Sequence, residues 1–108
     1  MALSIKPRIV VEDDSFLRVI QIVLDRAAPG DLFEAFAYFC AHDLPDFRGW
    51  CDRARGRVRH LYPADVRLVR DRDELLANIP GADALVVEAL PVGAPEIAAA
   101  MLQRQQAG

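Results

Sequence analysis

Residues 66–100 read VRLVRDRDELLANIPGADALVVEALPVGAPEIAAA, and this stretch decides the class of fold. Short apolar segments rich in β-branched residues alternate in it with segments that suit helices, and Pro80-Gly81 separates one helix from the next strand. Strands that alternate with helices predict a parallel sheet in an α/β fold. The elements predicted here are a strand at Asp65–Val69, a helix from Asp71 to before Pro80, a strand at Ala84–Glu88 and a helix from Ala94 or Pro95 to Gln105.

The N-terminal half adds one more strand and three helices to this pattern. Residues Arg8–Glu12 suit a strand that is buried on both faces. The segment Asp13–Ser15 offers caps for a helix that continues to Asp25, and further helices are predicted over Asp31–Ala41 and from Pro45 to about Arg55. The expected order is therefore β-α-α-α-β-α-β-α, with about three parallel strands and helices on both faces.

Size, charge and cysteine content limit the classes of function. The 108 residues are enough for one domain with a modest core, so 1–108 is predicted to be a single α/β domain. The formal net charge of −3 gives no general attraction to nucleic acid or to anionic membranes, and neither is expected as a partner. Cys40 and Cys51 are too few for a disulfide scaffold, and their spacing fits no zinc site. No signal peptide or membrane span is recognisable, so a cytoplasmic location is expected.

The acids after the first strand suggest a phosphoryl-accepting receiver domain. Such a domain needs an acid pair after its first strand, an aspartate after its third and a lysine on a later strand, because three carboxylates hold a divalent cation. Asp13 and Asp14 can supply the pair. However, the acceptor position holds Glu88, and the only lysine of the chain, Lys6, precedes the first strand. This is the least favoured interpretation, and the two aspartates are expected to favour a helix start by about 0.5 kcal/mol each.

From Val66 onward the sequence resembles the N-terminal part of the D-isomer-specific 2-hydroxyacid dehydrogenases. The resemblance is carried by the strand at Gly81–Val87, the loop at Glu88–Gly93 and the alanine-rich Glu96–Ala100, while Pro29–Tyr62 is longer and more helical than the family's first crossover. It implies a flavodoxin-like substrate domain, here partial, that works with a dinucleotide-binding domain. NAD(P) and a small 2-hydroxy or 2-keto acid are thereby implied for a longer enzyme.

The resemblance also implies a substrate site. In the family, the substrate carboxylate meets backbone N–H groups of the loop after the strand that here ends at Glu88, and α/β folds bind ligands beyond the carboxyl ends of their strands. The implied substrate-binding residues are Ala89, Leu90, Pro91, Val92 and Gly93. Glu88 departs from the family because an acid would repel a carboxylate substrate. A plain turn between strand and helix is the alternative for this loop.

No catalytic, cofactor-binding or metal-binding residue is assigned in this chain. It contains no G-x-G-x-x-G, and the family's catalytic arginine, acid and histidine lie in or after the cofactor domain. The expected function is a truncated substrate domain of an NAD-dependent oxidoreductase, inactive by itself, with continuation beyond Gly108 left open. The alternative is a non-enzymatic α/β protein that acts as a homo-oligomer or as a subunit of a larger assembly. The basic cluster between Arg48 and Arg59 is interpreted as a solvated helix face, with a phosphate contact as the alternative.

Overall fold

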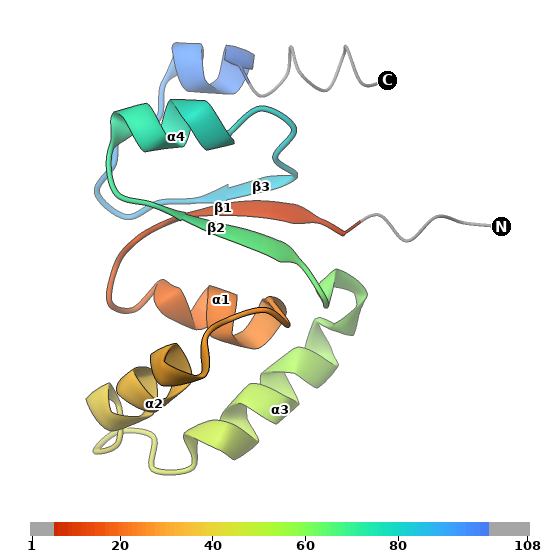
Figure 1. Cartoon of the computed structure of the whole chain (residues 1–108), viewed down its shortest axis with the longest axis vertical. Coiled ribbons are helices and arrows are strands. Elements are labelled where there is room, and N and C mark those ends of the chain that lie inside the picture. The colour runs from red at the N-terminus through yellow and green to blue at the C-terminus, as the bar shows by residue number, and fades with distance from the viewer. Residues whose placement is uncertain (1–5, 100–108) are drawn as a thin grey trace, which may run out of the picture.

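A computed structural model of the chain describes residues 6–99 and contains a parallel sheet of three strands in the order β2-β1-β3 (Figure 1). The strands are β1 (Arg8–Glu12), β2 (Asp65–Val69) and β3 (Ala84–Val86). This confirms the predicted α/β class and the parallel pairing. The order is that of the first three strands of a flavodoxin-like sheet.

Helices cover both faces of this sheet. They are α1 (Arg18–Leu24), α2 (Gly30–Phe39), α3 (Phe47–Arg57), the short 3-10 helix η1 (Arg59–Leu61) and α4 (Arg72–Asn78), followed by a helix at residues 94–99. Figure 1 shows α1, α2 and α3 on one face, and α4 with the last helix on the other. The rest of the helix predicted to reach Gln105 lies outside the described residues. The structure thus confirms the predicted order of elements up to residue 99.

Two aspartates, Asp14 and Asp71, cap backbone N–H groups where helices or the turns before them begin. Asp14 caps the turn that leads into α1, because its Oδ1 accepts from the backbone N–H groups of Phe16 at 2.8 Å and Leu17 at 3.2 Å. The helix itself therefore begins only at Arg18, later than the sequence predicts. Asp71 caps α4 directly, since its Oδ1 accepts from the N–H of Glu74 at 2.9 Å.

The core lies in two layers, one on each side of the sheet. Alternate residues of β1 point to opposite faces, so Val11 belongs to the layer under α1–α3 and Val10 to the layer under α4. Both valines are fully buried. On the first face, Phe47 is 3% exposed and stacks on Phe36, with ring centroids 5.0 Å apart. The aromatic side chains of α2 and α3 thus belong partly to the core, although Phe39 is 52% exposed.

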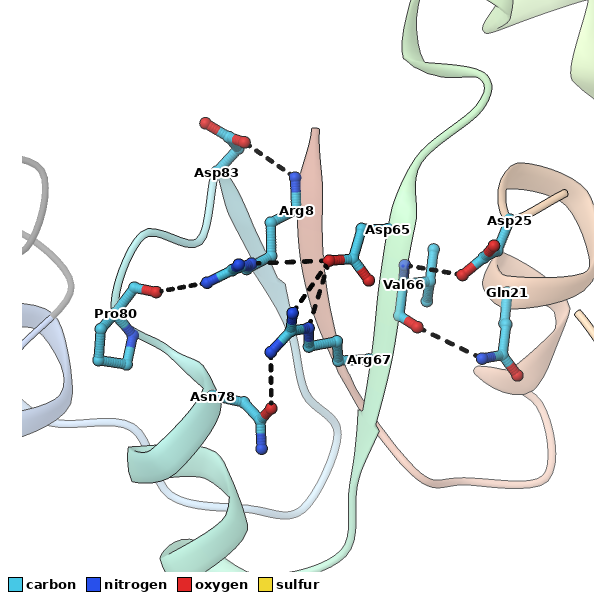
Figure 2. Close-up of polar contacts among 9 residues, drawn as sticks. All are labelled: Arg8, Gln21, Asp25, Asp65, Val66, Arg67, Asn78, Pro80 and Asp83. Atoms are coloured by element: carbon cyan, nitrogen blue, oxygen red, sulfur yellow. Dashed lines mark hydrogen bonds and ion pairs between the residues drawn. The ribbon is translucent and has the colours of Figure 1, made fainter. Parts of the chain in front are cut away.

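The two edges of the sheet differ in their hydrogen bonding. At the outer edge of β2, the N–H of Val66 donates to Asp25 Oδ2 at 3.0 Å, and Gln21 Nε2 donates to the Val66 carbonyl at 3.3 Å (Figure 2). Helix α1 and the residue after it therefore bind both main-chain groups of Val66 on this edge. At the outer edge of β3, none of residues 6–99 hydrogen-bonds the outward main-chain groups of Ala84 and Val86. In the described part of the chain, the β3 edge is therefore open to a further strand.

A polar network joins α4 to the sheet at the end where the strands begin. Asp65 Oδ2 accepts from Arg67 Nη2 at 3.2 Å and lies 3.8 Å from Arg8 Nε (Figure 2). Arg67 Nη1 donates to Asn78 Oδ1 at 3.3 Å, and Arg8 Nη1 donates to the Pro80 carbonyl at 2.9 Å. Each basic group here has an acceptor from the chain itself, so this network is structural.

Candidate functional site

Three consecutive main-chain N–H groups meet one carboxylate at the end of β3. The N–H groups of Glu88, Ala89 and Leu90 donate to Oε1 of Glu12 at 3.0, 2.8 and 2.8 Å. Glu12 is the last residue of β1. The N–H of Leu90, followed by those of Ala89 and Glu88, lowers the pKa of Glu12 below its ordinary value. We call residues 87–93 the β3 loop; its first half is a backbone nest of the kind that binds anions.

The sheet topology explains why the nest lies there. Strands β1 and β3 are parallel neighbours, so their carboxyl ends meet at the same side of the sheet. After β1 the chain turns toward α1 on one face, and after β3 it turns toward the helix at 94–99 on the other (Figure 1). In open α/β sheets this divergence of neighbouring connections is where ligands bind. The nest therefore occupies the position that the topology favours for a ligand.

Two further carboxyl groups share this side of the sheet. A hydrogen bond with Asp14 raises the pKa of Glu88, and the negative charges of Asp14 and Glu12 act in the same direction. The pKa of Asp14 is lowered, first by the N–H of Phe16. Asp14 therefore ionises first, and Glu88 keeps its proton to higher pH than an isolated glutamate.

The acids do not assemble as a receiver site requires. Asp13 Oδ1 accepts from Arg18 Nε at 2.6 Å, and this contact raises the pKa of Arg18. In the described part of the chain, no group of three or more His, Cys, Asp and Glu side chains is arranged to hold a metal ion. Lys6 precedes β1 and so lies at the other end of that strand. Of the residues that the receiver interpretation uses, only Asp14 and Glu88 come together.

The far end of the β3 loop is held by a second carboxylate. Glu96 Oε2 accepts from the N–H of Gly93 at 3.0 Å, and Glu96 Oε1 accepts from Arg72 Nε at 3.2 Å. The Glu96 side chain is 5% exposed, and its pKa is lowered, first by its own N–H and then by that of Gly93. These contacts start the helix at 94–99 and join it to α4.

The structure places all five predicted substrate-binding residues in the β3 loop. They are Ala89, Leu90, Pro91, Val92 and Gly93. Four of these residues have an N–H group, and three of those groups already donate to carboxylates of the chain itself. Leu90 also packs against the core layer under α4, which anchors the middle of the loop. The N–H groups of the β3 loop thus bind two carboxylates in this structure, and both are side chains of this chain, Glu12 and Glu96.

Sequence reasoning missed both of these carboxylate residues. The strand pattern identifies Glu12 only as the end of an apolar strand, although a single acid that ends a buried strand is a signal for a polar partner at the sheet's end. Glu96 follows Gly93 by three positions, which is the spacing that lets a glutamate reach back to an unpaired N–H at a helix start.

The predicted basic cluster does not form one surface. Arg55 points into the domain, where its Nε donates to the Val23 carbonyl at 2.8 Å and its Nη2 donates to the Ile22 carbonyl at 3.3 Å. Its guanidinium carbon also lies 5.0 Å from the ring centroid of Tyr62. Arg55 therefore satisfies carbonyls at the end of α1, and the solvated helix face applies only to other members of the cluster, such as the 62% exposed Arg53.

Comparison with protein-family models, with curated proteins and with solved structures found no match for this chain. Within residues 6–99, no helix has the length and apolar character needed to cross a membrane.

Proposed function

We propose that this chain is the substrate-domain portion of an NAD-dependent D-2-hydroxyacid dehydrogenase-like oxidoreductase, and that its β3 loop receives the carboxylate of a small 2-hydroxy or 2-keto acid. The observation that carries this proposal is the meeting of three main-chain N–H groups on one carboxylate oxygen of Glu12. The contact supports the proposal because it is the type of contact that a substrate carboxylate would make. It also lies in the loop to which the family resemblance points.

The unequal edges of the sheet support a longer chain. At the β2 edge Gln21 and Asp25 bind the main chain of Val66, whereas none of residues 6–99 binds the outward main-chain groups of β3. A flavodoxin-like sheet in the order 2-1-3 continues with its fourth strand beside strand 3. We therefore expect the complete enzyme to add parallel strands next to β3.

The role of this chain's residues in the reaction is binding and orientation. The described residues do not fit a dinucleotide, because α1, the helix that follows β1, is preceded by Asp13–Leu17 and not by a glycine-rich turn. We assign no step of hydride transfer to them. NAD(P) would bind the domain that the family places after the first part of the substrate domain.

The test is an assay of NADH oxidation with the native protein purified from its source cells. We expect turnover with pyruvate or another small 2-oxo acid. With pyruvamide, which lacks the carboxylate, we expect kcat/KM to fall at least about tenfold, because a charge-assisted hydrogen bond is lost in the transition state. Absence of NADH oxidation with a panel of 2-oxo acids would refute the proposed function.

A second candidate function is self-association of a non-enzymatic protein, and one observation favours it. Phe16, Tyr38 and Phe39 are 67%, 88% and 52% exposed, and the rings of Phe16 and Phe39 touch edge to face at 5.3 Å. Helix α2 has no fully buried residue. A two-fold dimer through this surface would cover the aromatic rings. Sedimentation velocity over a concentration series tests it: a dimer that Phe39→Ser dissociates supports the candidate, and a monomer at every concentration excludes it.

A further inference from the structure

The nest in the β3 loop has no donor left over for a ligand. Glu88, Ala89 and Leu90 are its three donors, and all three N–H groups point at the same oxygen, Oε1 of Glu12. The next residue, Pro91, has no N–H. A ligand carboxylate that is to use these donors must therefore replace the one already there.

We propose that Glu12 is an internal competitor of the ligand: its carboxylate occupies the nest in the ligand-free protein, and a carboxylate ligand binds by displacing it. The inference rests on the proposed function for the identity of the ligand, a small 2-hydroxy or 2-keto acid. The competition itself depends only on the contact between Glu12 and the loop.

The contacts that hold the Glu12 carboxylate in the nest are of a kind that a ligand could replace. Across residues 6–99 no ion pair involves Glu12, and only its Oε1 accepts hydrogen bonds. The nearby charged groups that act on it are acidic, Asp14 and Glu88, so no cation holds it in place. The contacts with the N–H groups of Glu88 and Ala89 are exposed, which gives a dissolved ligand access to the same donors.

Glu96 provides the contrast within the same loop. It also accepts from a loop N–H, that of Gly93, but Arg72 binds its second oxygen and its side chain is only 5% exposed. Displacing Glu96 would break an ion pair and open the start of a helix. The ligand site is therefore at the Glu12 end of the loop.

The experiment uses acetate as the probe and follows the amide signals of residues 88–90 by NMR. We expect acetate to shift these signals in Glu12→Ala at a concentration at least about tenfold lower than in the wild-type chain, because a tethered carboxylate acts at a high effective concentration. Glu12→Gln keeps the shape of the side chain with a neutral acceptor, so it should lie between the two. Glu34→Ala removes one negative charge from the exposed surface of α2, and it should behave as the wild type.

The outcomes separate this inference from the proposed function. If folded Glu12→Ala and Glu12→Gln respond to acetate no better than the wild type, the inference is wrong, whatever the enzyme assay shows. If acetate binds as expected but the native protein oxidises no NADH, the competition stands and the dehydrogenase proposal fails. If neither variant folds, the same measurement on the wild type tests the inference. The amide signals of residues 88–90 must then shift with concentrated acetate and not with chloride at the same ionic strength, and the inference is wrong if they do not.

Discussion

Truncation of Leu75 should destabilise the domain through the core layer that anchors the β3 loop. Leu75 of α4 is fully buried, and the layer around it includes Val10 of β1 and Leu90 of the loop. Leu75→Ala removes three carbon groups at about 0.8 kcal/mol each, or about 2.4 kcal/mol, and the remaining cavity brings the loss to about 3–4 kcal/mol. A chain of this length has a free energy of unfolding of about 5–16 kcal/mol, so the variant should fold but unfold at lower urea.

The neighbouring leucine is a matched control for this prediction. Leu76 lies on the same helix but is only partly buried and packs against neither core layer. Leu76→Ala changes helix propensity equally, and we expect it to lose less than about 1 kcal/mol. Urea unfolding, followed by circular dichroism and by the fluorescence of Trp50, measures both variants. Equal losses for the two variants would refute the two-layer core described here.

Three further predictions concern other parts of the molecule. Because the pKa of Glu88 is raised, ionising it opposes folding, and its contribution to stability should fall as the pH rises above the ordinary pKa of about 4.5. Glu88→Gln should therefore unfold at higher temperature than the wild type at pH 7 but not at pH 4. Burial raises the pKa of Cys51 to about 11, so a thiol reagent at about pH 8 should modify Cys40 much faster than Cys51, as mass spectrometry of the labelled peptides would show. Arg55→Ala should lower the free energy of unfolding in urea by about 2 kcal/mol, since two carbonyls at the end of α1 lose a charged donor.

Much of the fold follows from local sequence signals. The bounds of β1 and β2 agree with the predicted strands because isoleucine, valine and leucine make up three of the five residues in each. The main departures occur where side chains bind the backbone. Asp14 caps a turn and delays α1 to Arg18, and β3 ends at Val86 where Glu88 was predicted. The second departure has a clear cause: the N–H groups from residue 88 onward turn toward Glu12.

The sequence indicates the loop of the candidate site but not the carboxylate that binds it. A resemblance pointed to the loop residues Ala89–Gly93, since small residues and a proline after a strand can be read in the sequence. The partner Glu12 precedes its three donors, Glu88 to Leu90, by 76 to 78 positions, and its contact depends on β1 lying beside β3. No local pattern contains that information, because strand order is a property of the whole sheet.

The most direct test of the account is the mass and sequence of the native protein from its source cells. The proposed function predicts peptides that read through Gly108 into a longer chain, in which an apolar strand followed by G-x-G-x-x-G opens a nucleotide-binding domain of about 150 residues. A native protein whose C-terminal peptide ends at Gly108 would contradict it and would remove hydride transfer from the functions of this chain.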